Sequence, residues 1–138
     1  MSVLHASSLS QVIAYELLER WGIDGFMSHV EKIEDFYRHR RDMMLNAADK
    51  HLTGLCQWSV PEGGMFLWFN VPGVNDTWDM LLKRGLEKNI MLLPGHAFKP
   101  GTGTKKSSNM RAAFSVAAES DFEVAFERLA QLIKEEMK

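Results

Sequence analysis

Residues 61–71 read Pro-Glu-Gly-Gly-Met-Phe-Leu-Trp-Phe-Asn-Val, a turn followed by an apolar run. The Gly63-Gly64 pair allows a sharp bend or a close approach of the backbone to a ligand, and a plain hairpin turn is the more common explanation. The run from Met65 to Phe69 has no polar break, which is typical of a strand covered on both faces. We therefore predict a strand over residues 65–71 with both faces covered.

Three further segments predict strands. Residues 55–60 give a weak strand pattern, and residues 90–93 predict a short buried strand that stops at Pro94-Gly95. After a polar loop over residues 99–109, residues 110–116 alternate strictly between two faces. One face is apolar and carries Met110, Ala112, Phe114 and Val116. The other face carries Arg111, Ala113 and Ser115.

Four segments carry helical periodicity. The first, residues 8–21, opens with a Ser8-x-x-Gln11 capping box and breaks at Gly22. The second runs from about residue 26 to about residue 52, and a helix more than twice the average length usually bridges two bodies or lies along the edge of one. The third opens near residue 75, and the fourth follows a Ser120-x-x-Glu123 capping box. This order predicts an α/β chain (an α+β small domain) whose three- to four-stranded sheet has helices packed on it, preceded by a long interdomain helix.

Composition limits the class of protein. The chain has 138 residues, of which 46% are apolar and 25% charged, as in a soluble globular protein of one domain. Its formal charge of −2 argues against a nucleic-acid surface, and no basic block or apolar run suits a membrane. The single Cys56 excludes an intramolecular disulfide and suits a reducing compartment, so we expect a cytoplasmic protein, with the mitochondrion as an alternative.

Most residues that could carry chemistry have an ordinary explanation. His29 and His39 are too far apart on one helix to share a metal ion, and the other three histidines have no ligand partner at suitable spacing. Cys56 has no basic neighbour in sequence, so we expect an inert thiol. Arg111 is different because it lies in an otherwise apolar strand, where it must reach solvent or meet an anion. A structural ion pair and an anion-binding site are equally compatible with this position.

Three motifs in order resemble one enzyme class. Residues 61–68, 93–98 and 110–115 resemble successive signatures in the C-terminal part of fold-type I, pyridoxal-phosphate-dependent aminotransferases. The likeness extends over essentially the whole chain and is greatest to the kynurenine/α-aminoadipate and fungal aromatic aminotransferase branch. It implies that residues 1–25 are the tail of the large cofactor-binding domain and that residues 26–138 are the C-terminal small domain.

The resemblance also implies roles for three residues. In that class the arginine of the R-x-x-F-S pattern, here Arg111, binds the α-carboxylate of the substrate. Phe66 of the G-G-M-F pattern would lie near the substrate side chain, and Phe98 after P-G-x-A would line the same region. For both phenylalanines, a place in the sheet core is the alternative.

The chain departs from the class in its catalytic motifs. Members hold pyridoxal 5'-phosphate covalently on a lysine of the large domain, and neither that motif nor the phosphate cup occurs here. We therefore expect no catalytic and no cofactor-binding residue in this chain, and no activity from the chain alone. The full-length homodimer would exchange an amino group between an L-amino acid (aromatic, kynurenine or α-aminoadipate type) and a 2-oxo acid. The alternative is a non-catalytic ligand-binding region of an aminotransferase-like transcription regulator.

Overall fold

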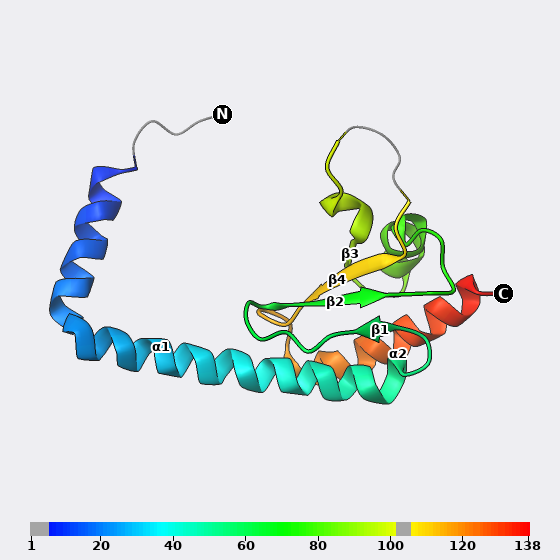
Figure 1. The fold of residues 1–138 in the computed structure, drawn as a ribbon, viewed down its shortest axis with the longest axis horizontal. Coiled ribbons are helices and arrows are strands. Elements are labelled where there is room, and N and C mark those ends of the chain that lie inside the picture. The colour runs from blue at the N-terminus through cyan, green and yellow to red at the C-terminus, as the bar shows by residue number, and fades with distance from the viewer. Residues whose placement is uncertain (1–5, 102–105) are drawn as a thin grey trace. The chain divides into compact units, whose positions relative to one another are not determined.

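The computed structural model describes residues 6–101 and 106–138. The chain divides into two units, Met1–Phe36 and Tyr37–Lys138, and helix α1 (Ser8–Leu52) runs through the boundary between them (Figure 1). Within the first unit α1 is interrupted at Gly22, whose φ of 58° and ψ of −172° are not helical. The predicted break at Gly22 is thus confirmed. The domain boundary expected at residue 25 concerns a longer protein and stays a prediction.

The second unit is built on a four-stranded antiparallel sheet of order β1-β2-β4-β3. Its strands are β1 (Gln57–Trp58), β2 (Phe66–Asn70), β3 (Leu93–Pro94) and β4 (Asn109–Ala113). In the ladder Arg111 pairs with Trp68 on one side and with Leu93 on the other. Helix α2 (Glu119–Glu136) and the C-terminal part of α1 lie on the same side of this sheet (Figure 1). The expected fold class, a small sheet with helices packed on it, is therefore confirmed.

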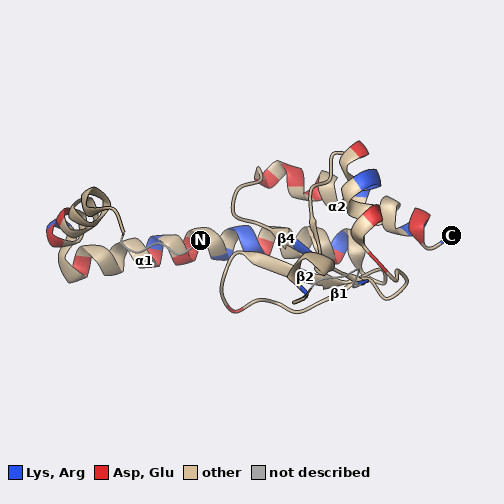
Figure 2. Ribbon diagram, turned by 90° about the horizontal axis from the view of Figure 1, so that it is seen from above, with Lys and Arg blue, Asp and Glu red and all other residues tan. Residues whose placement is uncertain are grey.

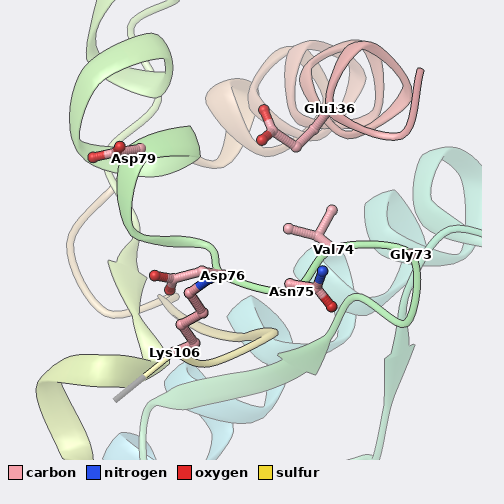
Figure 3. A pocket seen from close by; sticks show the side chains of 7 residues that line it. All are labelled: Gly73, Val74, Asn75, Asp76, Asp79, Lys106 and Glu136. Atoms are coloured by element: carbon pink, nitrogen blue, oxygen red, sulfur yellow. The ribbon is translucent and has the colours of Figure 1, made fainter. Parts of the chain in front are cut away.

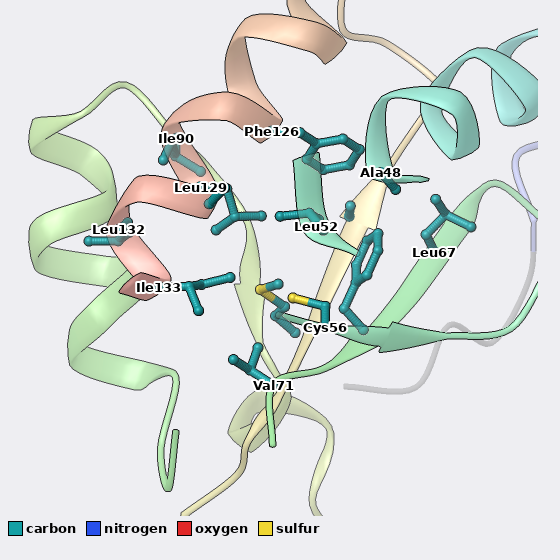
Figure 4. Close-up of a cluster of buried hydrophobic side chains, with 14 of the residues drawn as sticks. Ala48, Leu52, Cys56, Leu67, Val71, Ile90, Phe126, Leu129, Leu132 and Ile133 are labelled. Atoms are coloured by element: carbon teal, nitrogen blue, oxygen red, sulfur yellow. The ribbon is translucent and has the colours of Figure 1, made fainter. Parts of the chain in front are cut away.

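The hydrophobic core lies between this sheet and the two helices. The sheet contributes Leu67 and Phe69 of β2, and the rings of Phe69 and Phe126 meet edge to face at 5.7 Å. Figure 4 shows side chains of α2 gathered with Leu52 of α1 and Cys56 in this layer. Each fully buried large apolar side chain contributes roughly 1.5–3 kcal/mol. Burial of these side chains therefore stabilises the packing of the sheet on the two helices.

The opposite face of the sheet is open in this chain, so the prediction of a strand covered on both faces is wrong here. Leu67 and Phe69 are buried, whereas Phe66 and Trp68 between them are 38% and 41% exposed. An unbroken apolar run hides this alternation because all its residues have the same polarity. The open face therefore became visible only in the structure.

The connection between β2 and β4 contains two short helices. A π-helical turn, η1 (Met80–Gly85), lies inside a helical stretch over residues 78–87, and a 3₁₀ turn, η2 (Gly95–Phe98), follows β3. The predicted third helix is confirmed but begins three residues late, and the η2 turn was not predicted. The buried strand expected over residues 90–93 is wrong in position and burial: β3 is two residues long, includes Pro94, and has Leu93 43% exposed. Part of the predicted polar loop, residues 102–105, lies outside the described residues.

Two capping predictions and one strand end need correction. The Glu123 carboxylate accepts hydrogen bonds from Lys50 and His51 instead of closing a capping box, and no side chain caps α2. In α1 the Gln11 amide donates to the Ala6 carbonyl at 3.1 Å rather than to the Ser8 backbone. Strand β4 ends at Ala113, which leaves the predicted inward residue Val116 90% exposed.

The early end of β4 is explained by Arg40, a buried arginine of α1. Its Nε donates to the carbonyl of Phe114 and its Nη2 to the carbonyl of Ala117. These two carbonyls are therefore satisfied by a side chain rather than by a neighbouring strand. Arg40 thus ties α1 to the segment that connects β4 with α2.

Candidate functional site

The open face of the sheet carries a group of four side chains that we call the Arg111 cluster: Phe66, Trp68, Phe98 and Arg111. Phe66 and Trp68 face the same side because they are two residues apart on β2. Arg111 reaches that side from β4, since Met110 and Ala112 on either side of it point into the core. Phe98 comes from the end of η2. Strand alternation therefore places three of the four residues.

The guanidinium of Arg111 packs close to two aromatic rings. Its Cζ is 3.9 Å from the centroid of the Phe66 ring and 4.4 Å from that of the Phe98 ring. Such cation–π contacts contribute about 0.5–2 kcal/mol each, more as the cation loses water. A guanidinium carries five N–H donors, so packing against two rings leaves donors for further hydrogen bonds. The half-buried Arg111 is thus suited to bind a planar anion.

No ion pair of Arg111 is recorded within residues 6–101 and 106–138. The structural ion pair that the sequence left open therefore has no carboxylate in the described part of the chain. An anion that Arg111 binds has to come from another molecule or from another part of the protein.

The structure places two of the predicted site residues, Phe66 and Phe98, in contact with the third, Arg111. The two phenylalanines are 38% and 42% exposed, so neither belongs to the buried sheet core. Trp68 was not predicted to belong to the site, although its ring meets the Phe98 ring edge to face at 5.4 Å. The signal that could have found it is its spacing of two residues from Phe66 on one strand.

The described residues do not fit a covalently held pyridoxal phosphate. A lysine that forms such a bond is activated by a desolvated setting. The described lysines are exposed, except for Lys88, which is half-buried and donates to Glu135 at 3.0 Å. Among residues 6–101 and 106–138, no lysine has such a setting in this structure.

The described histidines have partners other than metals. His51 Nε2 lies 2.7 Å from the Glu123 carboxylate, and the His96 ring packs on Trp78 with centroids 4.9 Å apart. No group of three or more potential metal ligands occurs in the part of the chain that the structure describes, and His5 lies outside it.

A surface pocket of about 390 Å³ lies next to the loop after β2 (Figure 3). Its lining includes three acidic residues and one lysine: Gly73, Val74, Asn75, Asp76, Asp79, Lys106 and Glu136. The Asp76 carboxylate accepts hydrogen bonds from the backbone N–H groups of Trp78 and Ser107 at 3.3 Å. Its role there is to fold the loop, and none of the predicted site residues lines this pocket.

Two further sequence expectations concern Cys56 and surface charge. Cys56 is buried, and this burial raises the pKa of its thiol to about 12, which favours the inert thiol expected from the sequence.

Figure 2 shows acidic and basic residues interspersed along α1 and α2. Within the described residues, no helix combines the length and apolar character that a membrane span requires.

Comparison with known proteins identifies the class. A scan against protein-family models finds no match. The mitochondrial kynurenine/alpha-aminoadipate aminotransferase of Mus musculus is 44% identical over 137 residues, which cover 99% of this chain and 32% of the mouse protein. The aminotransferase tdiD of Emericella nidulans is 36% identical over 132 residues, 94% of this chain and 30% of that protein.

Solved structures agree in fold. LysN, an alpha-aminoadipate aminotransferase from Thermus thermophilus complexed with N-(5'-phosphopyridoxyl)-L-leucine, superposes with a TM-score of 0.81 at 26% identity over 96% of this chain and 32% of its own. The multiple substrate aminotransferase of Thermococcus profundus gives 0.78 at 36% identity over 92% of this chain and 30% of its own.

In sequence and in fold, the chain thus corresponds to a C-terminal part of the fold-type I aminotransferases. The branch indicated by its motifs, the kynurenine/α-aminoadipate and aromatic aminotransferases, is confirmed. The chain spans about a third of the length of the curated relatives it matches.

Proposed function

We propose that this chain is part of a pyridoxal-phosphate-dependent aminotransferase and supplies its substrate-carboxylate-binding residue, Arg111. The complete homodimer transfers an amino group between an L-amino acid of aromatic, kynurenine or α-aminoadipate type and a 2-oxo acid. The names of the relatives support the reaction class and the substrate range.

One observation carries the role of Arg111: its guanidinium packs against two rings, and it forms no ion pair within the described residues. A planar fork binds a carboxylate through two parallel N–H···O bonds, which fixes the direction of the substrate as well as its position. Held in this way, the Cα of the substrate is oriented for reaction. Phe66 and Phe98 then contact the carbon skeleton next to the carboxylate.

The catalytic and cofactor-binding residues belong to parts of the protein beyond the described residues. Pyridoxal phosphate supplies the electron-withdrawing group for amino transfer, and the large domain holds it. The 138-residue chain alone is therefore inactive. Mixing the purified chain with the cofactor, removing the excess and reducing with borohydride should leave no lysine carrying the cofactor in stoichiometric amount.

The decisive test replaces Arg111 in the full-length enzyme. Stranding one partner of a buried ion pair costs about 3–5 kcal/mol, so Arg111→Ala should lower kcat/KM for amino acids by roughly 10²–10³ or more. The corresponding decarboxylated amines should be nearly unaffected. Arg111→Lys should recover only part of the loss, because a point charge cannot make the two-pronged contact.

Other outcomes separate the alternatives. Equal losses for acids and amines, or an unchanged kcat/KM with a lower Tm, would show that Arg111 is a structural residue. A wild-type full-length protein that binds amino acids through Arg111 without turnover would favour the regulatory module instead.

A further inference from the structure

We propose that Trp68 is a positioning residue that holds the Phe98 ring over the guanidinium of Arg111. This inference rests on the proposed function, because it concerns how the carboxylate-binding arginine is prepared for its ligand. Trp68 itself acts through Phe98 and is not proposed to touch the substrate.

The two rings that contact Arg111 are held in place differently. Phe66 lies on β2, where hydrogen bonds to β4 fix its backbone opposite Ala113. Phe98 lies outside the sheet, at the end of the four-residue turn η2, and the next residue, Lys99, is already extended. The hydrogen bonds between β2 and β4 that position Phe66 therefore do not fix the position of Phe98.

Trp68 provides the missing support. It pairs directly with Arg111 across β2 and β4, so its side chain stands beside the guanidinium on the open face. Its ring meets the Phe98 ring edge to face, with centroids 5.4 Å apart and planes 79° apart. This T-shaped arrangement is a favoured geometry for aromatic pairs. Trp68 thus links the ladder to the one ring of the cluster that lies outside it.

The consequence is preorganisation of the guanidinium. With both rings in place, the guanidinium of Arg111 is partly dehydrated and held in one orientation. Binding of the carboxylate therefore costs less side-chain conformational entropy. Without Trp68, Phe98 gains rotamer freedom and Arg111 keeps only the Phe66 contact. Arg111 keeps its positive charge, but the orientation of its guanidinium becomes variable.

The experiment uses the 138-residue chain and reads Arg111 directly by NMR. The Nε–Hε resonance of Arg111 should be shifted upfield by the two rings, and titration with 3-phenylpropionate reports carboxylate binding at the same atoms. Trp68→Val should move the resonance toward its unstacked position and weaken binding of the probe by about 2- to 10-fold. Trp68→Phe, which keeps a ring edge, should restore most of both effects.

Two comparisons guard against a merely structural effect. Trp58→Val removes a tryptophan of the same sheet that packs on Phe69 at 5.6 Å, in the core, and should leave the Arg111 resonance in place. If Trp68 acts through Phe98, the double variant Trp68→Val with Phe98→Ala should bind the probe no more weakly than Phe98→Ala alone.

The failure of each proposal has its own signature. An Arg111 resonance that is unchanged in Trp68→Val and Trp68→Phe, or additive losses in the double variant, would overturn the positioning role. A different result would count against the proposed function alone. In that case the Arg111 resonance moves in Trp68→Val, which supports the role of Trp68, but the wild-type resonance does not change when 3-phenylpropionate is added. Should Trp68→Val fail to fold, Trp68→Leu, which also removes the ring, takes its place, and an unchanged Arg111 resonance in that folded variant would overturn the positioning role.

Discussion

The guanidinium carbon of Arg111 lies 3.9 Å from the centroid of the Phe66 ring, although the two residues occupy different strands and are not paired in the ladder. Phe66 pairs with Ala113, two residues beyond Arg111, so the contact is a diagonal one across β2 and β4. Diagonal neighbours on one face of a sheet are within reach of aromatic and long side chains. The contact is therefore built into the strand register.

Replacing Phe66 tests the energetic value of this diagonal contact in the full-length enzyme. Phe66→Leu keeps an apolar side chain but removes the ring, so kcat/KM for amino acid substrates should fall by about 2- to 30-fold. Met65→Leu, at the exposed position just before β2, is the matched control and should leave kcat/KM unchanged. Equal kcat/KM in Phe66→Leu and wild type would show that the ring contributes nothing to the site.

Gly95 should tolerate no side chain. A Cβ at this position would lie 2.5 Å from Ser107 Oγ and 2.9 Å from the backbone oxygen of Asn109, and the backbone cannot move aside as a side chain can. Gly95→Ala should therefore lower the free energy of unfolding by about 1–3 kcal/mol, as overpacking does. Gly63→Ala, where nothing lies near the added atom, is the control in urea denaturation. Similar midpoints for the two variants would contradict the close approach.

Arg40 should be a large contributor to stability although it is not part of the Arg111 cluster. Arg40→Ala leaves the carbonyls of Phe114 and Ala117 without their charged donor, which should lower the free energy of unfolding by about 2–4 kcal/mol. Its neighbour Arg41, which pairs with Asp42 near the surface, gives the comparison, and Arg41→Ala should cost less than about 1 kcal/mol. Urea denaturation that ranks the two variants in the opposite order would refute this assignment.

Cys56 should make stability depend on alkaline pH. Its thiol has a pKa near 12 in the folded chain against an ordinary value of 9.0, so only the unfolded chain ionises it between these values. The stabilisation is complete below pH 9 and is lost as pH rises from 9 toward 12, by about 1 kcal/mol per pH unit. The wild type should thus lose more stability between pH 8.5 and 10.5 than Cys56→Ala does. Parallel losses in urea denaturation would exclude the thiol as the cause.

The first helical segment should promote self-association of the isolated chain. Leu9, Val12, Ile13 and Leu17 are all exposed, and apolar side chains gathered at helical spacing favour contact with a further surface. Leu9→Glu combined with Val12→Glu should therefore lower the mass measured by sedimentation at high concentration. A wild-type chain that stays monomeric at every concentration would argue against this effect.

Patterns that reflect a local rule were predictable from the sequence. The alternation around Arg111 places it on the face opposite Met110 and Ala112, and Gly22 breaks the first helix where only a glycine suits the backbone. The motif resemblance then led to Phe66 and Phe98, which the structure places against Arg111. Periodicity alone does not distinguish either phenylalanine from a core residue.

Features that depend on tertiary partners were not predictable. Val116 continues the alternation of β4 in sequence, yet Arg40, from a distant helix, takes the carbonyls that a longer strand would have used. Glu123 fits a capping box, but Lys50 and His51 compete for its carboxylate. In both cases the competing partner comes from α1, and no local pattern includes it.

The strand order has a consequence for how the protein is made. Strand β4 lies between β2 and β3 in the sheet, yet it is the last of the four to be synthesised. A nascent chain on the ribosome cannot complete the sheet until residue 113 has left the exit tunnel, and until then β2 has no partner on its β4 side. During that interval its aromatic run is exposed as an unpaired edge, the kind of segment that chaperones protect from aggregation. Correct synthesis of this domain therefore depends on a strand that arrives after most of the chain has already emerged.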